Sequence, residues 1–376
     1  MKNILKSTYI LVFCCLLLLP GLTWGAKHGA TDSSARESNY IKKMDQYLNL
    51  KLSINNDFQE FRIYSNQEII IKPNVSHAVR FSGHYRILSI SGGFSPGFIP
   101  GNHDDNTKGD TRTFGLGMNL NFKHWIQGIS YGHVKGFYLA NTADFDPNWS
   151  EGDDYVQFPD LVYNGFQGHT GYQVNPNFSS KALTSQTERQ LKGAGSLIAL
   201  LHYRYYIADN QVTLTGQNSS QKSNNFEMLI SLGYYRTFVL GKNFYVSAGL
   251  APAGGIIFTS LLTRQRSVDS TGQYTGPYHN TTVHYNDPIW RLEGSAALGY
   301  SSERFFAGVQ MMSSWEGYDE NSQSHIIVND RIAYQVFIGY RFKAPGIVVK
   351  TADIAEDKEN QLIHWLPWNW RKKSDP

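Results

Sequence analysis

Histidine and serine side chains could together perform acyl or lipid hydrolysis, in which a histidine activates a serine nucleophile beside an acid or a carboxamide. The candidate histidines are His84, His133, His169, His202, His279, His284 and His325. No serine, histidine and acid occur at a spacing that identifies a catalytic motif. We therefore predict that the protein is not an enzyme and assign no catalytic residue, with a lipid-modifying enzyme as the less favoured alternative.

Carboxylates in segment 101–110 resemble a calcium-binding loop. Counted from Asp104, however, Lys108 stands where a ligand is needed, and the twelfth position is Gly115 rather than glutamate. Asp153 and Asp154 form a second acidic pair, for which solvated turn carboxylates are the simpler interpretation. No glycine-rich phosphate loop precedes a helical segment. We predict no metal and no cofactor.

Charged side chains on the polar faces and ends of the predicted strands could define a pore. The set is Lys51, Arg80, His84, Arg86, Lys123, Arg204, Arg291, Glu293, Arg331 and Arg341. We predict that six of them face the lumen: Arg80, His84, Arg86, Arg204, Arg291 and Glu293. Such a lumen would be net positive and would favour anions. The alternative is an interior filled by side chains, which is common in small barrels.

These residues lie in segments whose polarity alternates with period two. In 114–122 and 331–342, one set of alternate residues is apolar and the other is mostly polar or small. This pattern predicts strands with two different faces. Less regular alternation occurs in 48–54, 79–87, 197–205, 228–234, 244–250 and 290–300.

The predicted connections alternate in length along the chain. The short ones are 72–77, 123–126, 241–243 and 301–303, with 185–193 of intermediate length. The long ones are 92–111, 140–170, 208–225, 261–286 and 316–330, and only 55–57 breaks the rule. Long strands, short periplasmic turns and long outer loops indicate a membrane barrel. The predicted fold class is all-β: a transmembrane antiparallel up-and-down β-barrel of about twelve strands.

The N-terminus has the pattern of a secretory signal peptide. Lys2 and Lys6 precede an apolar run at 9–19, and small residues lead to predicted cleavage after Gly25. This run is shorter than the roughly 20 residues of a spanning helix. Both cysteines lie inside the predicted signal (1–25), so we expect no disulfide in the mature chain. We predict export to the outer membrane.

The remaining predicted regions flank the barrel. Residues 26–46 form a periplasmic N-terminal segment, helical near 41–46, residues 47–343 form the barrel, and residues 344–376 form a periplasmic tail. The tail contains three tryptophans beside basic residues, which suits a membrane interface. The chain has 34 basic and 31 acidic residues, so its charge gives no general attraction to nucleic acid.

Two stretches resemble an outer-membrane family called domain of unknown function forty-four twenty-one. They read NPNFS at 175–179 and QTERQLKGAGS at 186–196. The family usually has an aromatic residue where Ser180 stands and a serine where Gly193 stands. Supporting pieces lie at 39–41, 73–74, 135–139 and 159–161. The resemblance implies an outer-membrane barrel, and the family carries no assigned activity.

The family-like turn contains four polar residues: Gln186, Glu188, Gln190 and Lys192. We interpret it as a hydrogen-bonded turn folded into the barrel mouth, with a partner-docking site or a gating plug as the alternatives.

For function, we predict a pore for small polar or anionic solutes. The alternative is a plugged barrel that acts in binding or structure through its outer loops. The expected partners are outer-membrane lipid, lipopolysaccharide, a small polar solute and, during insertion, the barrel-assembly machinery.

Overall fold

The computed structural model describes residues 39–56, 58, 60–64, 67–214, 218–268, 274–318, 325–327, 331–350 and 353. The predicted signal peptide and the tryptophans of the tail lie outside these residues. No helix among the described residues is long and apolar enough to cross a membrane.

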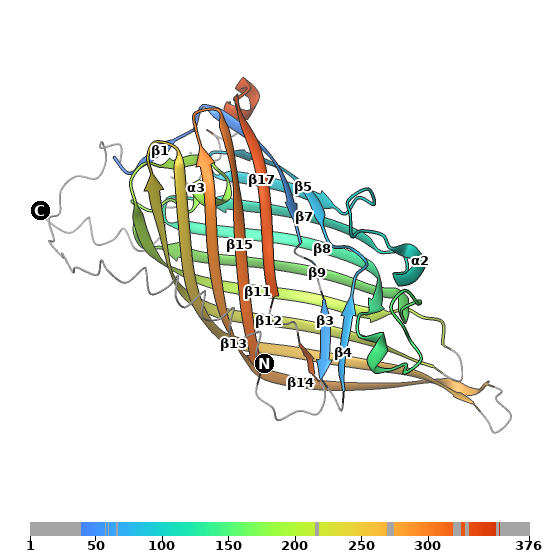
Figure 1. Ribbon diagram of the computed structural model, residues 1–376. Coiled ribbons are helices and arrows are strands. Elements are labelled where there is room, and N and C mark those ends of the chain that lie inside the picture. Colours follow the sequence, from blue (N-terminus) through green and yellow to red (C-terminus); the bar gives the residue numbers. More distant parts are fainter. Residues whose placement is uncertain are drawn as a thin grey trace, which may run out of the picture.

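Twelve strands of the described chain form a closed antiparallel barrel (Figure 1). Each strand pairs with its neighbours in the barrel, and the last pairs with the first over Lys343↔Tyr47 to Gln335↔Asn55. The strands are β2 (Tyr47–Asn55), β5 (Ala78–Tyr85), β6 (Leu88–Phe94), β7 (Arg112–Asn121), β8 (Trp125–Leu139), β9 (Gln157–Gln173), β11 (Ala194–Asn210), β12 (Ser219–Leu240), β13 (Phe244–Val268), β14 (Tyr274–Ser301), β15 (Phe305–Tyr318) and β17 (Arg331–Lys343). The predicted all-β barrel of about twelve strands is confirmed.

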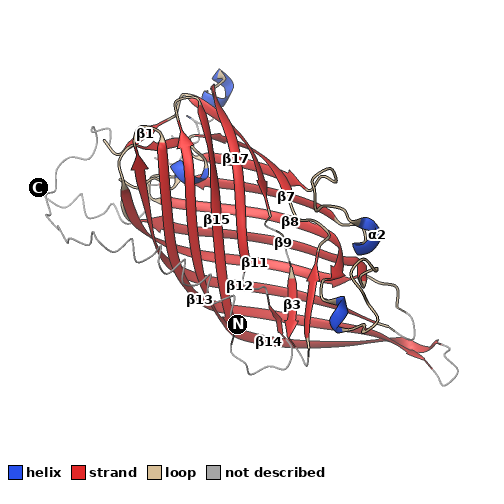
Figure 2. Cartoon of the chain, in the orientation of Figure 1, coloured by secondary structure: helices blue, strands red, loops and turns tan. Residues whose placement is uncertain are grey.

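The other elements lie at the two ends of the barrel (Figure 2). At the end with the long connections, a hairpin and a short strand extend the sheet from β8. These strands are β3 (Phe61–Tyr64), β4 (Glu68–Lys72) and β16 (His325–Ile327), and the helices α2 (Asp105–Lys108) and η1 (Thr142–Asp144) follow β6 and β8. At the short-turn end lie β1 (Ile41–Lys43), α3 (Lys181–Thr184) and β10 (Glu188–Gln190).

The barrel wall has an apolar outer face and a more polar inner face. On β17 the outward Ile332, Val336 and Ile338 are 58%, 48% and 49% exposed, whereas the inward Arg341 is fully buried. This is the arrangement expected where lipid replaces water outside a barrel, because every strand must present apolar side chains to the hydrocarbon.

The first third of the chain differs from the prediction. Residues 72–77 are not an inner turn, because β3 and β4 form a hairpin at the long-loop end. The inner turn is instead the two residues Arg86 and Ile87, which join β5 to β6. Neither glycine nor asparagine marks this turn, although Arg86 has a positive φ of 49°. The predicted strand 79–87 is therefore too long, because β5 ends at Tyr85, before a turn that the residue types do not reveal.

Other predicted loop boundaries, and the helix predicted near 41–46, were also wrong. Strands β12, β13 and β14 continue well into the segments predicted as outer loops at 208–225 and 261–286. Strand β9 begins at Gln157, so the outer loop ends earlier than 170 and the inner segment is longer than 185–193. Residues 41–43 form strand β1 rather than a helix, because they pair with β10.

The β3–β4 hairpin packs onto the long-loop end of the barrel. Phe61 and Ile71 are buried against Phe137, Tyr163 and Tyr206. The rings of Phe61 and Phe137 are 5.5 Å apart and tilted by 51°, a favourable aromatic contact.

Gly136 lies at an irregularity of β8, where the register with β9 shifts between Lys135 and Phe137. Its φ is +88°, and an added Cβ would overlap the carbonyl oxygen of Asp110. We expect Gly136→Ala to lower the free energy of unfolding by about 1–3 kcal/mol, because alanine is strained in this conformation.

Gly132→Ala on the same strand is the matched control, because nothing lies within 4 Å of its added Cβ. Urea titration of the refolded barrels, followed by tryptophan fluorescence, compares the two variants. Equal midpoints for both would contradict the role given to Gly136.

Candidate lumenal site and its plug

Residues 174–193, here called the plug, connect β9 to β11 at the short-turn end (Figure 1). The plug contains α3 and β10, and several of its side chains are almost fully buried: Phe178, Ser179, Ser185, Gln186 and Thr187. Short turns mark the periplasmic end of such barrels, so this is the mouth that the plug occupies.

Inward side chains of the wall bind the last carbonyls of α3. Asn49 Nδ2 donates to the Ser185 carbonyl at 3.1 Å, and Lys51 Nζ donates to the Thr184 carbonyl at 2.9 Å. On the other side, Gln310 Nε2 donates to the Leu183 carbonyl at 2.5 Å. The C-terminal carbonyls of a helix lack partners within the helix. The wall supplies these partners and so holds the plug.

Arg341 is a fully buried wall residue that contacts the plug. Its Nη2 and Nε donate to the Gln186 carbonyl at 2.9 and 3.2 Å, and its Nη1 donates to the Ser302 carbonyl at 2.5 Å. Gln186 has a positive φ of 57° and also donates to the Tyr245 hydroxyl at 3.1 Å. One guanidinium therefore joins the plug to a periplasmic turn.

Two of the family-motif residues organise the plug from within. Glu188 accepts a hydrogen bond from Ser179 Oγ at 2.6 Å and pairs with Lys181 Nζ at 3.4 Å. Gln190 accepts from the Ser179 backbone N–H at 2.8 Å and donates to the Asn177 carbonyl at 2.7 Å. Together these contacts connect the NPNFS stretch to the second motif stretch.

The side of the plug that faces away from the lumen is attached to the N-terminal segment and to neighbouring short turns. Strands β1 and β10 pair over three residues, and Lys192 Nζ lies 5.6 Å from the centre of the Tyr40 ring. Arg189 binds Glu303 at 3.1 Å, and Lys42 also binds Glu303 at 2.5 Å. The hydrogen bond from Lys42 lowers the pKa of the Glu303 carboxyl, so this contact persists at neutral pH.

Between the plug and the long-loop end, the lumen contains a cavity of about 540 Å³. This volume is within the range typical of small-ligand sites. Its charged and histidine lining residues are Arg80, His169, His202, Arg204, Glu227, Arg291, Glu293 and Glu316. Three arginines and three glutamates balance, so the predicted net positive lumen does not hold for this cavity.

Four charged residues on one wall form a buried network. Arg204 binds Glu227 through both carboxylate oxygens, with one contact at 3.0 Å. Arg291 binds Glu316 at 2.5 Å and lies 3.6 Å from Glu227. Glu227 is only 1% exposed, so these two guanidinium groups, rather than water, surround its carboxylate.

Small residues on β13 let Arg291 reach Glu227 across that strand. On β13, Ala253 pairs directly with Arg291 and Ile257 pairs directly with Glu227, so the inward residue between these two levels is Gly255. A larger inward side chain here would separate the two charges.

The predicted lumen residues occupy different places. Arg80, Arg204, Arg291 and Glu293 line the cavity, whereas His84 does not line it. His84 is 5% exposed, and neither ring nitrogen has a hydrogen-bond partner. Arg86 pairs with Asp353 at 2.6 Å at the short-turn end, so it lies outside the cavity.

The sequence analysis did not identify Glu227 and Glu316 as residues that face the lumen. Glu227 shares its inward parity with Ser223 and Asn225, and that shared parity is the signal that could have identified it. Nothing in the spacing shows that it faces two arginines.

His202 provides the one serine–histidine contact at this cavity within the described chain. Its Nε2 lies 2.9 Å from Ser231 Oγ. Ser231 is 1% exposed, and no carboxylate among the described residues is hydrogen-bonded to His202. The geometry supplies a buried polar contact but not a complete catalytic triad.

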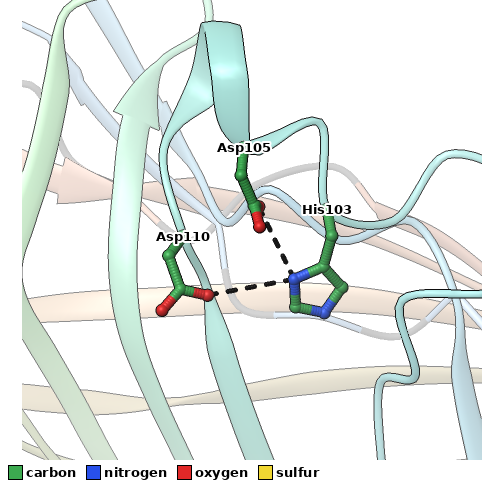
Figure 3. A group of neighbouring side chains, drawn as sticks. All are labelled: His103, Asp105 and Asp110. Carbon is green, nitrogen blue, oxygen red and sulfur yellow. Dashed lines mark ion pairs between the residues drawn. The ribbon is translucent and has the colours of Figure 1, made fainter.

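A second group of titratable residues lies in the outer loop around α2 (Figure 3). His103 Nδ1 is 3.6 Å from Asp105 and 3.9 Å from Asp110. Each acid has another partner, because Asn74 donates to Asp105 at 3.1 Å and Arg112 donates to Asp110 at 3.0 Å. Both carboxylates are therefore engaged by neighbouring residues as well as by His103.

The family model described as Domain of unknown function (DUF4421) matches residues 31–342. The chain belongs to the DUF4421 family. The predicted resemblance to this family of suspected outer-membrane barrels is thus confirmed. No curated protein matches the sequence.

Solved outer-membrane barrels are similar to this DUF4421 chain at low identity. OmpT, an outer membrane protein of Vibrio cholerae, is 8% identical, with 83% of this chain and 100% of that chain covered and a TM-score of 0.27. The outer membrane protease OmpT of Escherichia coli is 8% identical, with coverages of 80% and 96% and a TM-score of 0.27. The P. putida toluene transporter TodX is 8% identical, with coverages of 82% and 91% and a TM-score of 0.24.

The prediction that the protein is not an enzyme is corrected. A protease is among the matched barrels, beside a transporter, so the fold gives no ground for excluding an enzyme.

Proposed function

We propose that this DUF4421 protein is a gated outer-membrane barrel that passes small polar solutes. Solutes enter the lumenal cavity from outside, and they reach the periplasm when the plug moves. Insertion by the barrel-assembly machinery and contact with outer-membrane lipid and lipopolysaccharide follow from this proposal. The observation that carries it is the plug, which is held inside the periplasmic mouth by polar side chains of the wall.

The contacts of the plug support a movable rather than a permanent closure. Its attachments to β2, β15 and β17 are hydrogen bonds, and three of them end on backbone carbonyls at the end of α3. The hydrogen bonds from Asn49 and Gln310 contribute about 0.5–1.5 kcal/mol each, and those from the charged Lys51 and Arg341 about 1.5–3 kcal/mol each. A solute or a periplasmic partner could therefore displace the plug without unfolding the barrel.

The test is solute flux into proteoliposomes. Replacing residues 177–191 by a short Gly-Ser linker removes the plug and leaves the bounds of β9 and β11 unchanged. We expect at least tenfold faster entry of a monosaccharide than with the wild-type barrel. The matched control replaces the exposed outer segment 146–153 by the same type of linker and should leave flux unchanged.

Heat-modified mobility on gels establishes that each variant is folded. Equal flux through the folded wild-type and plug-replaced barrels would contradict the proposed gate.

A further inference from the structure

The cavity has two walls of opposite charge. Arg80 reaches it from β5, whereas Glu293 reaches it from β14, which is separated from β5 by β15, β17 and β2 in the order of the barrel. The two side chains therefore approach the same space from different parts of the wall.

Within the described part of the chain, the Arg80 guanidinium forms no ion pair with a carboxylate. Its neighbour Phe81 is outward and 58% exposed, so the alternate position of Arg80 directs its side chain inward, where it lines the cavity. Its strand partner Ser53 contributes a hydroxyl but no charge. Among the described residues, no carboxylate pairs with the Arg80 guanidinium, which is thus available to an anionic group of a solute.

Glu293 is the least buried of three carboxylates that face two arginines. Arg204 and Arg291 face three carboxylates, those of Glu227, Glu293 and Glu316. Glu227 and Glu316 are 1% and 4% exposed and are bonded at short distance, whereas Glu293 is 22% exposed. Glu293 pairs with Arg291 at 3.6 Å, and its carboxylate also lies near His202 and Tyr235. Its carboxylate can therefore accept a hydrogen bond from a cationic group.

We propose that the cavity binds a small zwitterion, with its carboxylate on Arg80 and its ammonium group on Glu293. This inference rests on the proposed function and names the solute class. A single anion would leave Glu293 with only its 3.6 Å contact to Arg291, and a single cation would leave Arg80 without a carboxylate partner among the described residues. A solute with both charges satisfies both walls through charge-assisted hydrogen bonds, which are stronger than neutral ones. The 540 Å³ volume accommodates an amino acid.

The test is calorimetric titration of the full-length, detergent-solubilised barrel. The probes are ω-amino acids from glycine to 6-aminohexanoate, each compared with the carboxylate and the amine of the same length. We expect one chain length to bind at least tenfold more tightly than its matched carboxylate or amine.

Two variants assign the contacts. Arg80→Gln should reduce affinity for the zwitterion at least tenfold while leaving affinity for the amine unchanged. Glu293→Gln should also reduce affinity for the zwitterion at least tenfold, while leaving affinity for the carboxylate unchanged. Lys123→Gln removes a charge from an exposed periplasmic turn and should leave the affinities for the zwitterion, the carboxylate and the amine unchanged.

Binding of the carboxylate as tightly as the zwitterion would overturn the inference, and so would the absence of binding at every chain length. In either case the plug-replacement flux measurement uses a neutral sugar and decides the gate independently. A zwitterion site without plug-dependent flux would instead support binding and contradict passage.

Discussion

Glu227→Gln is expected to reduce the free energy of unfolding of the barrel by about 3–5 kcal/mol. The substitution keeps the volume of the side chain but removes the charge that faces Arg204 and Arg291. These guanidinium groups are only 12% and 13% exposed, so water cannot replace the lost carboxylate. Urea titration of the refolded protein in detergent, followed by tryptophan fluorescence, measures the change.

Glu293→Gln is the matched control, because it removes a carboxylate from the same wall. Glu293 is more exposed and has a looser contact with Arg291, so we expect a loss below about 1 kcal/mol. Equal losses for the two variants would contradict the distinction between a buried charge network and a solute-facing acid.

Arg341→Gln is expected to raise the probability of an open plug more than tenfold. The arginine is fully buried and makes hydrogen bonds to the Gln186 carbonyl, the Ser302 carbonyl and Ser301 Oγ. Hydrogen bonds to charged groups contribute about 1.5–3 kcal/mol each, and 1.4 kcal/mol is a factor of ten in an equilibrium. Single-channel recording in a planar bilayer measures the open probability.

Arg236→Gln controls for the loss of an arginine near the same end of the barrel. Arg236 lies 5.1 Å from the ring of Phe238, and no hydrogen bond joins its side chain to the described plug. An open probability that is unchanged by Arg341→Gln in a folded barrel would show that this contact does not hold the plug.

The alternation of polarity was sufficient to predict the wall of the barrel. The predicted last strand, 331–343, coincides with β17, because each outward position must be apolar in lipid. The turn at Arg86 and Ile87 was not predictable from residue type, since a positive φ in a non-glycine residue depends on its surroundings.

The candidate site was predictable only in part. Period-two alternation placed Arg80, Arg204, Arg291 and Glu293 on the inner face, where they line the cavity. Pairing across strands requires the register, and no sequence pattern shows that Glu227 lies opposite Arg204. The net charge of this cavity was therefore misjudged.

The plug shows the same limit. Gln186, Glu188 and Gln190 were recognised as a family-like turn. The partners of Gln186 come from β17 and β13, which are distant in the sequence. The partners of Glu188 and Gln190 come from residues 177–181 of the plug itself. Local propensity cannot identify the contacts of Gln186 with β17 and β13, because they form only when the barrel closes around the plug, nor the contacts within the plug, because they depend on its folded path.

The most direct test of the gate is a reversible tether between plug and wall. Asn49→Cys and Ser185→Cys replace residues joined by a hydrogen bond of 3.1 Å, and a short bis-methanethiosulfonate reagent can connect them. In the Arg341→Gln background, the gate predicts that the tether abolishes single-channel openings and that a reductant restores them. Openings of the same size and frequency in the tethered and reduced protein would contradict it.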